Sequence, residues 1–288
     1  MVEILSFAHD VEGGCAPISL AYERRGAGEP VVLLHGIGHH WQAWEPVLGI
    51  LAAEREVIAV DLPGFGASAA LPPGVGYDLP ELLAVLHRFF DELGLDRPHV
   101  VGNSLGGLLA LELGRTGRAR TVTAVSPAGF WTEVERRYGF GMLRVMHRAT
   151  RTLPDPLVGR LAGTAVGRAV LVGAVYARPG RRAAHRVVAE ARAMRQGPGF
   201  APTLAAGLRA RYTHDVPGVP VTIAWGSADR LLLPRQGPRA KRTIPAARLI
   251  RLPRCGHVPM NDDPALVARV ILDATRPTAT PPRPDAAS

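Results

Sequence analysis

Cysteine and lysine are both scarce in this chain of 288 residues. Cys15 and Cys255 are the two cysteines, and two thiols give no basis for a disulfide framework. Of the 34 basic residues, Lys241 is the single lysine, and the glycine-rich turns lack the lysine of a phosphate-binding loop. No spacing of histidine, cysteine and carboxylate side chains predicts a metal site, so we expect neither a metal nor another cofactor.

Long apolar runs are also absent. The most apolar stretch, residues 161–177, is interrupted by Arg168, which excludes a transmembrane helix of the usual length of about 20 residues. Residues 1–5 lack the basic region and the small-residue cleavage site of a signal peptide, so we expect a cytoplasmic location. We expect a small-molecule partner rather than a nucleic acid or a membrane span, and a homodimer stays open.

Short apolar segments alternate with segments of helical periodicity along most of the chain. With 47% hydrophobic residues, the chain is long enough to bury one large core. The sequence predicts strands at residues 18–23, 31–34, 57–61, 99–103 and 122–126, and helices at residues 42–53 and 80–93. This alternation predicts an α/β fold with a mostly parallel sheet covered by helices on both faces, with the ligand beyond the carboxyl ends of the strands.

A serine lies where a predicted strand meets a predicted helix. The strand at residues 99–103 runs into Gly102-Asn103-Ser104-Leu105-Gly106, and a helix-like apolar segment follows at residues 108–113. Such a turn holds the serine hydroxyl out of the sheet under backbone strain, and the flanking glycines avoid crowding. We therefore predict Ser104 as a nucleophile rather than an ordinary helix cap.

A serine nucleophile needs a base and an acid that orients the base. His257 lies on a loop directly after the strand-like residues 249–252. Asp229 lies on a loop beyond a β-branched strand that ends at Gly226. The chain order Ser104, Asp229, His257 is that of one known type of catalytic triad, so we predict these three residues as the triad.

Two other carboxylates, Asp262 and Asp263, lie closer to His257 in the sequence. Both stand at the start of a predicted helix, where a capping role is sufficient to explain them. The segment after the strand that follows the nucleophile, residues 126–129, holds no carboxylate. Both observations favour Asp229 as the acid.

Donors for a developing oxyanion are predicted after the strand at residues 31–34. That strand ends in His35-Gly36-Ile37-Gly38, where glycines let the backbone turn an N–H toward the serine. We predict that the N–H of Ile37 and the N–H of Leu105 form the oxyanion hole. The histidine of this motif is expected to brace the loop without transferring a proton.

Five motifs, each after a predicted strand, carry a family resemblance: His35-Gly36-Ile37-Gly38, the segment 61–68, the segment 102–107, the segment 226–229 and Gly256-His257. Together they resemble the α/β-hydrolase superfamily, in its compact capped branch, over residues of about 18 to 275. The resemblance implies a core formed by residues 1–126 and 220–275 and an inserted helical cap at residues 127–219. The proline- and alanine-rich tail, residues 276–288, is predicted to be disordered.

The segment 127–219 is too long for a single crossover helix. It holds helical pieces predicted at residues 132–150, 156–176 and 181–195. Candidate substrate contacts are Trp41, Phe130, Trp131 and Val258, and further apolar side chains of the segment, expected mostly to pack it onto the core, are Phe140, Met142, Leu143 and Met146. Between residues 136 and 211, fifteen arginines stand against two acidic residues, which we interpret as solvated helix faces in preference to an anion site.

The serine at the turn indicates acyl chemistry. The related haloalkane dehalogenases and epoxide hydrolases have an aspartate at that position, so the sequence favours hydrolysis of a carboxylic ester of a small hydrophobic substrate. Hydrolases that cleave carbon–carbon bonds of ring-cleavage products are the first alternative, although they usually carry a tryptophan where this chain has Val258. A cofactor-free haloperoxidase-like esterase and a ligand-binding receptor that retains the triad also stay open.

Overall fold

A single eight-stranded sheet organises the chain in the computed structural model, which describes residues 2–11 and 14–276. The strand order is β1-β2-β4-β3-β5-β6-β7-β8. The strands are β1 (Val2–Val11), β2 (Gly14–Arg25), β3 (Pro30–Leu34), β4 (Glu56–Val60), β5 (His99–Asn103), β6 (Thr121–Val125), β7 (Val221–Gly226) and β8 (Arg248–Leu252). β1 and β2 pair antiparallel, as do β2 and β4, and all the other pairs are parallel.

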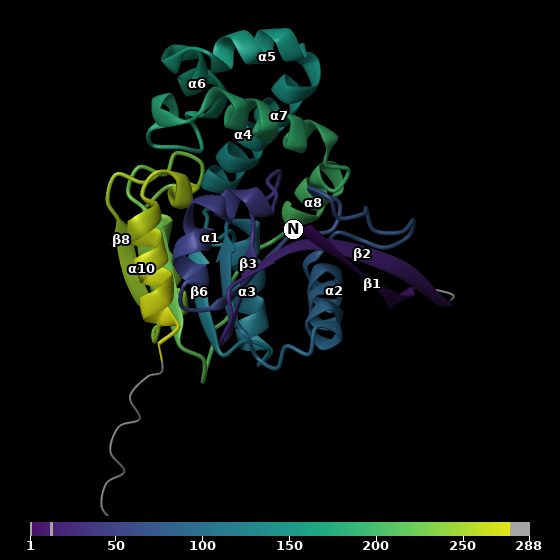
Figure 1. Cartoon of the computed structure of the whole chain (residues 1–288). Coiled ribbons are helices and arrows are strands. Elements are labelled where there is room, and N and C mark those ends of the chain that lie inside the picture. Colours follow the sequence, from purple (N-terminus) through teal and green to yellow (C-terminus); the bar gives the residue numbers. More distant parts are fainter. Residues whose placement is uncertain (1, 12–13, 277–288) are drawn as a thin grey trace, which may run out of the picture.

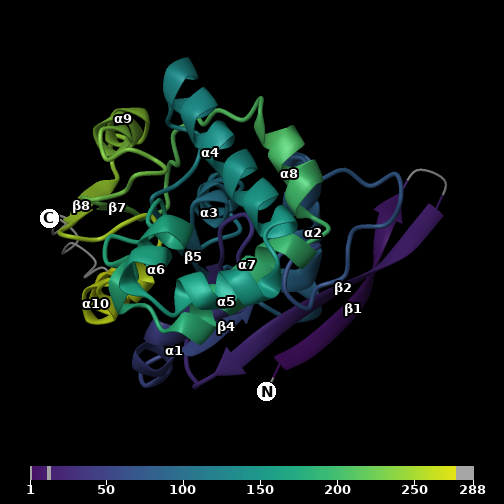
Figure 2. The same cartoon turned by 90° about the horizontal axis from the view of Figure 1, so that it is seen from above.

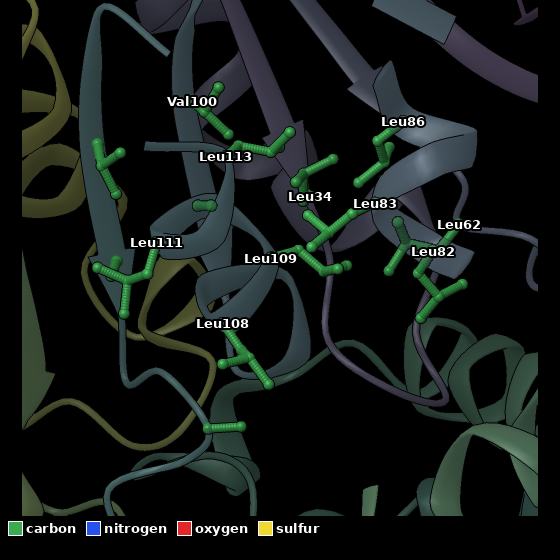
Figure 3. Packing of buried hydrophobic residues seen from close by; sticks show 14 of the residues in the cluster. Leu34, Leu62, Leu82, Leu83, Leu86, Val100, Leu108, Leu109, Leu111 and Leu113 are labelled. Atoms are coloured by element: carbon green, nitrogen blue, oxygen red, sulfur yellow. The ribbon is translucent and has the colours of Figure 1, made fainter. Parts of the chain in front are cut away.

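Alternate residues of the central strands point to opposite faces of the sheet. On β3, Val32 and Leu34 join one core, and Val31 and Leu33 join the other. The first core packs against α2 (Leu79–Glu92), α3 (Leu105–Arg115) and α9 (Gln236–Thr243), as Figure 3 shows for the leucines of α2 and α3 around Leu34. The second packs against α1 (Glu45–Ala52) and α10 (Pro264–Ala274). The predicted sheet with helices on both faces is therefore confirmed.

The first strand was not predicted from the sequence. β1 is an edge strand that pairs only with β2 in the described part of the chain, and Phe7 and His9 are its buried side chains. Its apolar residues fall on both faces, with Ile4 exposed and Phe7 buried, so the segment lacks the strict alternation that marks a half-buried strand.

Five helices lie between β6 and β7, and Figure 1 shows them gathered above one end of the sheet. They are α4 (Glu133–Thr152), α5 (Asp155–Ala162), α6 (Ala165–Val172), α7 (Ala184–Gln196) and α8 (Phe200–Gly207). We refer to residues 127–219 as the insertion. Its buried Glu135 accepts hydrogen bonds from Arg235 and Arg239 of the core, at 2.5 and 2.8 Å, and so ties the start of α4 to the α9 region.

One helix prediction in the insertion was wrong. Residues 156–176 were expected to form one helical piece, but they form α5 and α6. The break falls at Gly163 and Thr164, because the Thr164 hydroxyl accepts the N–H of Gly167 at 3.0 Å and caps a new helix. Helix α8 was not predicted at all.

The predicted disorder of residues 276–288 falls almost entirely on residues 277–288, which lie outside the described residues. Across the part of the chain that is described, no helix combines the length and apolar character that crossing a bilayer requires.

The closest backbone approach near the centre of the sheet is at the turn between β5 and α3. A Cβ added at Gly102 would lie 1.9 Å from the Gly106 carbonyl oxygen, and one at Gly106 would lie 2.1 Å from the Leu34 carbonyl oxygen. Both distances are far below van der Waals contact, so the chain turns this tightly only because both residues are glycine. The residue at the tip, Ser104, has φ 57° and ψ −113°, a backbone conformation that residues other than glycine rarely adopt.

We predict that Gly106→Ala lowers the free energy of unfolding by roughly 3 kcal/mol, because its methyl group meets backbone that cannot rotate away. The matched control is Gly49→Ala inside α1, where a Cβ meets nothing within 4 Å. The control is expected to raise stability by about 1 kcal/mol through helix propensity. Urea unfolding of both variants measures the difference, and a wild-type midpoint for Gly106→Ala would contradict the prediction.

Candidate active site

Ser104 is fixed by backbone contacts on both sides of the turn. Its N–H donates to the Val125 carbonyl of β6 at 3.0 Å, and its carbonyl accepts the N–H of Leu108 and the N–H of Ala128, both at 3.0 Å. The residue is buried, so its hydroxyl faces a confined space at the carboxyl end of β5. This is the position that the sequence predicted for a nucleophile.

His257 and Asp229 lie together, as predicted, on the loops after β8 and β7. Asp229 Oδ2 accepts a hydrogen bond from His257 Nδ1 at 2.8 Å, and both side chains are buried. Asp229 Oδ1 accepts the N–H groups of Leu231 and Leu232, at 2.9 and 2.8 Å. Because Nδ1 carries the proton of that bond, the other ring nitrogen is left as the basic one.

Ser104 and His257 line the same small cavity, of about 20 Å³. Among the described residues no hydrogen bond joins the Ser104 hydroxyl to the His257 ring. Such contacts are often long before a substrate is bound and tighten in the complex. The three predicted triad residues are therefore neighbours, with one of their two hydrogen bonds formed.

The loop that carries His257 is held from three directions. The His257 N–H donates to the Val175 carbonyl of the insertion at 2.7 Å, and Asn103 Nδ2 donates to the His257 carbonyl at 2.9 Å. Asp262 accepts the N–H of Gly256 at 2.8 Å, and its carboxylate also accepts two N–H groups at residues 177–178 of the insertion. Asp262 thus clamps the histidine loop to the insertion.

This clamp corrects one expectation about the two neighbouring carboxylates. Both were expected to cap a helix, but only Asp263 does so, by accepting the N–H of Leu266 at 3.0 Å. Asp262 lies before the cap position, where its carboxylate accepts three N–H groups from two loops. The sequence offered no signal for this role, because one of the loops belongs to a segment 85 residues away.

The predicted oxyanion donors flank the serine. Ile37 and Leu105 line an apolar pocket together with Ser104. Within residues 2–11 and 14–276, neither N–H donates to a protein acceptor. A Cβ added at Gly36 would lie 3.1 Å from Ser104 Cβ, which shows how closely the loop after β3 approaches the turn.

His35 braces that loop as a buried neutral ring. Its Nδ1 donates to the Gly36 carbonyl at 2.7 Å, and its Nε2 accepts the N–H of Leu62 at 2.9 Å. Burial lowers the pKa of His35 to about 3. The ring therefore joins the loops after β3 and β4 in its uncharged form.

Of the four predicted substrate contacts, only Trp131 lines a cavity at Ser104. It borders the apolar pocket, of about 60 Å³, that Ile37 and Leu105 also line. The Phe130 side chain packs against Tyr212 in the core, with the two rings tilted by 52°. The side chains of consecutive residues point in different directions here, so the sequence did not separate this pair.

Trp41 and Val258 also lie in the core and not in the described cavities at Ser104. The backbone N–H of Trp41 donates to Asp61 Oδ1 at 2.6 Å. This bond holds Trp41 in the segment just before α1. Burial raises the pKa of that Asp61 carboxyl to about 6. The Val258 N–H donates to the Val175 carbonyl at 3.3 Å, and its side chain belongs to the second core.

Several residues that line the cavities were not predicted. Helix α8 supplies Thr203 and Leu204 to the apolar pocket. Leu231 and Leu232, directly after Asp229, also line it. Of the apolar side chains expected mainly to pack the insertion, Phe140 and Leu143 border this pocket too, and Met142 and Met146 border a second chamber of about 310 Å³ inside the insertion.

We predict that His35 weakens the fold in acid. Its ring takes up a proton in the unfolded chain below the ordinary pKa of 6.5 but in the folded chain only near pH 3, so the unfolded state binds more protons between these values. The free energy of unfolding should fall by up to about 1.4 kcal/mol per pH unit from this group as the pH drops through that window. His35→Gln should show a smaller slope than the exposed-residue control His185→Gln, and equal slopes would refute the prediction.

A comparison with models of protein families matches residues 31–270 to the alpha/beta hydrolase family. Among curated relatives, the dihydrolipoyllysine-residue acetyltransferase component of the acetoin cleaving system from Pseudomonas putida is 31% identical over 80% of this chain and 59% of its own length. The protein of the same name from Cupriavidus necator is 37% identical over 48% of this chain and 36% of its own length. This chain spans less than two thirds of either relative.

A 2-hydroxy-6-oxo-2,4-heptadienoate hydrolase from Pseudomonas putida is 45% identical over 30% of this chain and 32% of its own length. Among solved structures, a thermophilic esterase from Thermogutta terrifontis matches with a TM-score of 0.74 and 23% identity, covering 94% of this chain and 97% of that one. The structural likeness shows the fold, and the family match extends over most of the sequence. The chain therefore belongs to the alpha/beta hydrolase family, as its motifs predicted.

Proposed function

We propose that this protein is a serine hydrolase that cleaves a carboxylic ester through an acyl-enzyme intermediate. The observation that carries the proposal is the hydrogen bond of 2.8 Å between Asp229 and His257, formed beside the cavity that Ser104 also lines. A buried carboxylate–imidazole pair next to a strained serine is the arrangement that activates a hydroxyl for attack.

In the proposed reaction the Ser104 hydroxyl oxygen bonds to the ester carbonyl carbon while His257 takes the hydroxyl proton. The N–H groups of Ile37 and Leu105 donate to the oxyanion that forms. The carbon–alkoxy bond then breaks, and His257 gives its proton to the departing alcohol. Asp229 keeps the ring in the tautomer that the cycle needs, and water hydrolyses the acyl-serine by the same route.

The insertion acts as a cap over this site in the proposal. The apolar pocket at Ser104, bordered by Trp131 and Leu204 of the insertion, accommodates one hydrophobic group of the substrate. Its lining is mainly apolar, and Arg136, which also borders it, is already paired with Glu133, so a charged group there would lose its hydration without a free partner. A small hydrophobic ester is the substrate class that these walls favour.

Carbon–carbon bond hydrolysis of a ring-cleavage product is the second candidate. It is favoured by the local identity of 45% to the 2-hydroxy-6-oxo-2,4-heptadienoate hydrolase. Against it, the residue after His257 is Val258, buried in the core. A panel of p-nitrophenyl esters of graded acyl length, run beside a ring-cleavage product, distinguishes the two reactions.

We expect Ser104→Ala to lower ester turnover by at least about 10⁴-fold and to abolish labelling by a fluorophosphonate probe, because Ser104 is the hydroxyl-bearing residue that lines the cavity with His257 among the described residues. Ser6→Ala, on the exposed edge strand, is the matched control and should keep both properties. Full turnover by Ser104→Ala would refute the proposal. Labelling of the wild type without turnover would favour a ligand-binding receptor instead.

Asp229→Asn should reduce kcat by about 10⁴-fold with little change in stability, because the amide no longer supports the required tautomer of His257. Asp263→Asn is the control, since asparagine caps a helix as well as aspartate does. It should retain wild-type kcat in the same steady-state assay. The reverse pattern, with loss in Asp263→Asn alone, would assign the acid elsewhere.

A further inference from the structure

The outward side of the insertion exposes aliphatic side chains. Ten large hydrophobic residues of the described chain are exposed, and six of them belong to the insertion: Val134, Tyr138, Val145, Leu157, Val166 and Val170. Val166 and Val170, one turn apart on α6, are 77% and 74% exposed, and Val145 on α4 is 66% exposed. Isolated exposed residues need no explanation, but a concentration of this kind on one segment does.

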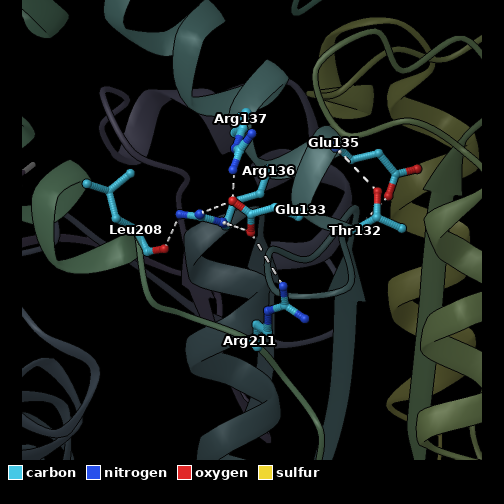
Figure 4. Close-up of polar contacts among 7 residues, drawn as sticks. All are labelled: Thr132, Glu133, Glu135, Arg136, Arg137, Leu208 and Arg211. Carbon is cyan, nitrogen blue, oxygen red and sulfur yellow. Dashed lines mark hydrogen bonds and ion pairs between the residues drawn. The ribbon is translucent and has the colours of Figure 1, made fainter.

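Exposed arginines accompany Val145 on α4. At the start of α4, Glu133 pairs with Arg136, Arg137 and Arg211, as Figure 4 shows. Further along the same helix, Arg144, Arg148 and Arg151 are exposed, and among the described residues none has an acidic partner. Their spacing of four and three residues places them on one side of α4.

We call the group formed by Arg144, Val145, Arg148, Arg151, Val166 and Val170 the outer face of the insertion. Figure 2 looks down on the insertion, with α4, α5 and α6 in front of the sheet. Val145 of α4 and Val170 of α6 both line the chamber of about 310 Å³. The outer face therefore borders an apolar chamber through Val145 and Val170.

The same chamber leads inward to the candidate active site. Met146, Val175 and Met194 line both the chamber and the small cavity at Ser104 and His257. An aliphatic chain entering between Val145 and Val170 would meet mainly apolar walls on its way to the serine. The volume corresponds to about ten water-sized groups, enough for one chain of moderate length.

We propose that the outer face of the insertion docks onto an anionic lipid surface. Arginines attract acidic headgroups, and aliphatic side chains enter the boundary between headgroups and acyl chains, which is the combination found on membrane-surface helices. A helix face that contacts only water gains no stability from valines that are three quarters exposed. Docking places the chamber rim against the lipid, so that an acyl chain passes directly from one apolar phase to another. This proposal goes beyond ester hydrolysis and does not depend on it.

Sedimentation of the full chain with vesicles tests the charged part of the surface. The vesicles contain phosphatidylcholine alone or with one third phosphatidylglycerol, at low and at physiological salt. Arg144→Gln/Arg148→Gln should lower the partition coefficient on the anionic vesicles by about 30-fold, from the usual contribution of a juxtamembrane arginine. The control Arg242→Gln/Arg269→Gln removes two exposed, unpaired arginines from α9 and α10 and should bind like the wild type.

Val166→Ser tests the apolar part, because Val166 is exposed and does not line the chamber. It should weaken binding to the anionic vesicles on the order of tenfold, while Ile50→Ser on the exposed side of α1 should not. Val166→Ser and Ile50→Ser should both keep wild-type turnover of p-nitrophenyl acetate, so that a loss of vesicle binding can be distinguished from a loss of catalysis. Equal binding by Arg144→Gln/Arg148→Gln and its control would overturn the proposal, and so would absence of binding to either vesicle or stronger binding to duplex DNA.

Discussion

The tight crossing of β3, β5 and α3 is the constraint from which the rest of the site follows. Gly102 and Gly106 allow the backbone of the turn to touch itself and the end of β3, and this contact leaves Ser104 at the tip in a strained conformation. The loop after β3 is pressed against the serine by the same approach. The predicted nucleophile and the predicted oxyanion donors are thus positioned by the same close backbone contact in the core.

The second half of the site is assembled from loops that meet only in the folded chain. Asp229 orients His257 from β7, Asn103 holds the His257 carbonyl from β5, and Asp262 ties the histidine loop to the insertion. Each of these contacts joins segments far apart in sequence. The Val175 carbonyl and the Asp262 carboxylate therefore join the histidine loop directly to the insertion.

The sequence predicted the sheet and the helices of both faces, and it selected the three residues of the proposed triad, because these choices follow local patterns. Apolar alternation marks buried strands, and glycines mark the turns at their ends. It did not predict which aromatic residues face the cavity, since Phe130 and Trp131 are neighbours whose side chains diverge only in the packed structure. It also missed α8 and the clamp at Asp262, because contacts with distant segments determine both.

A crystal structure of the protein after reaction with a fluorophosphonate tests the account most directly. The account predicts phosphorus bonded to Ser104 Oγ, with a phosphonyl oxygen about 2.7–3.1 Å from the N atoms of Ile37 and Leu105. It also predicts the His257 ring beside the leaving-group position with its bond to Asp229 intact. Phosphorus on another residue, or an oxygen that faces away from both N–H groups, would contradict the account.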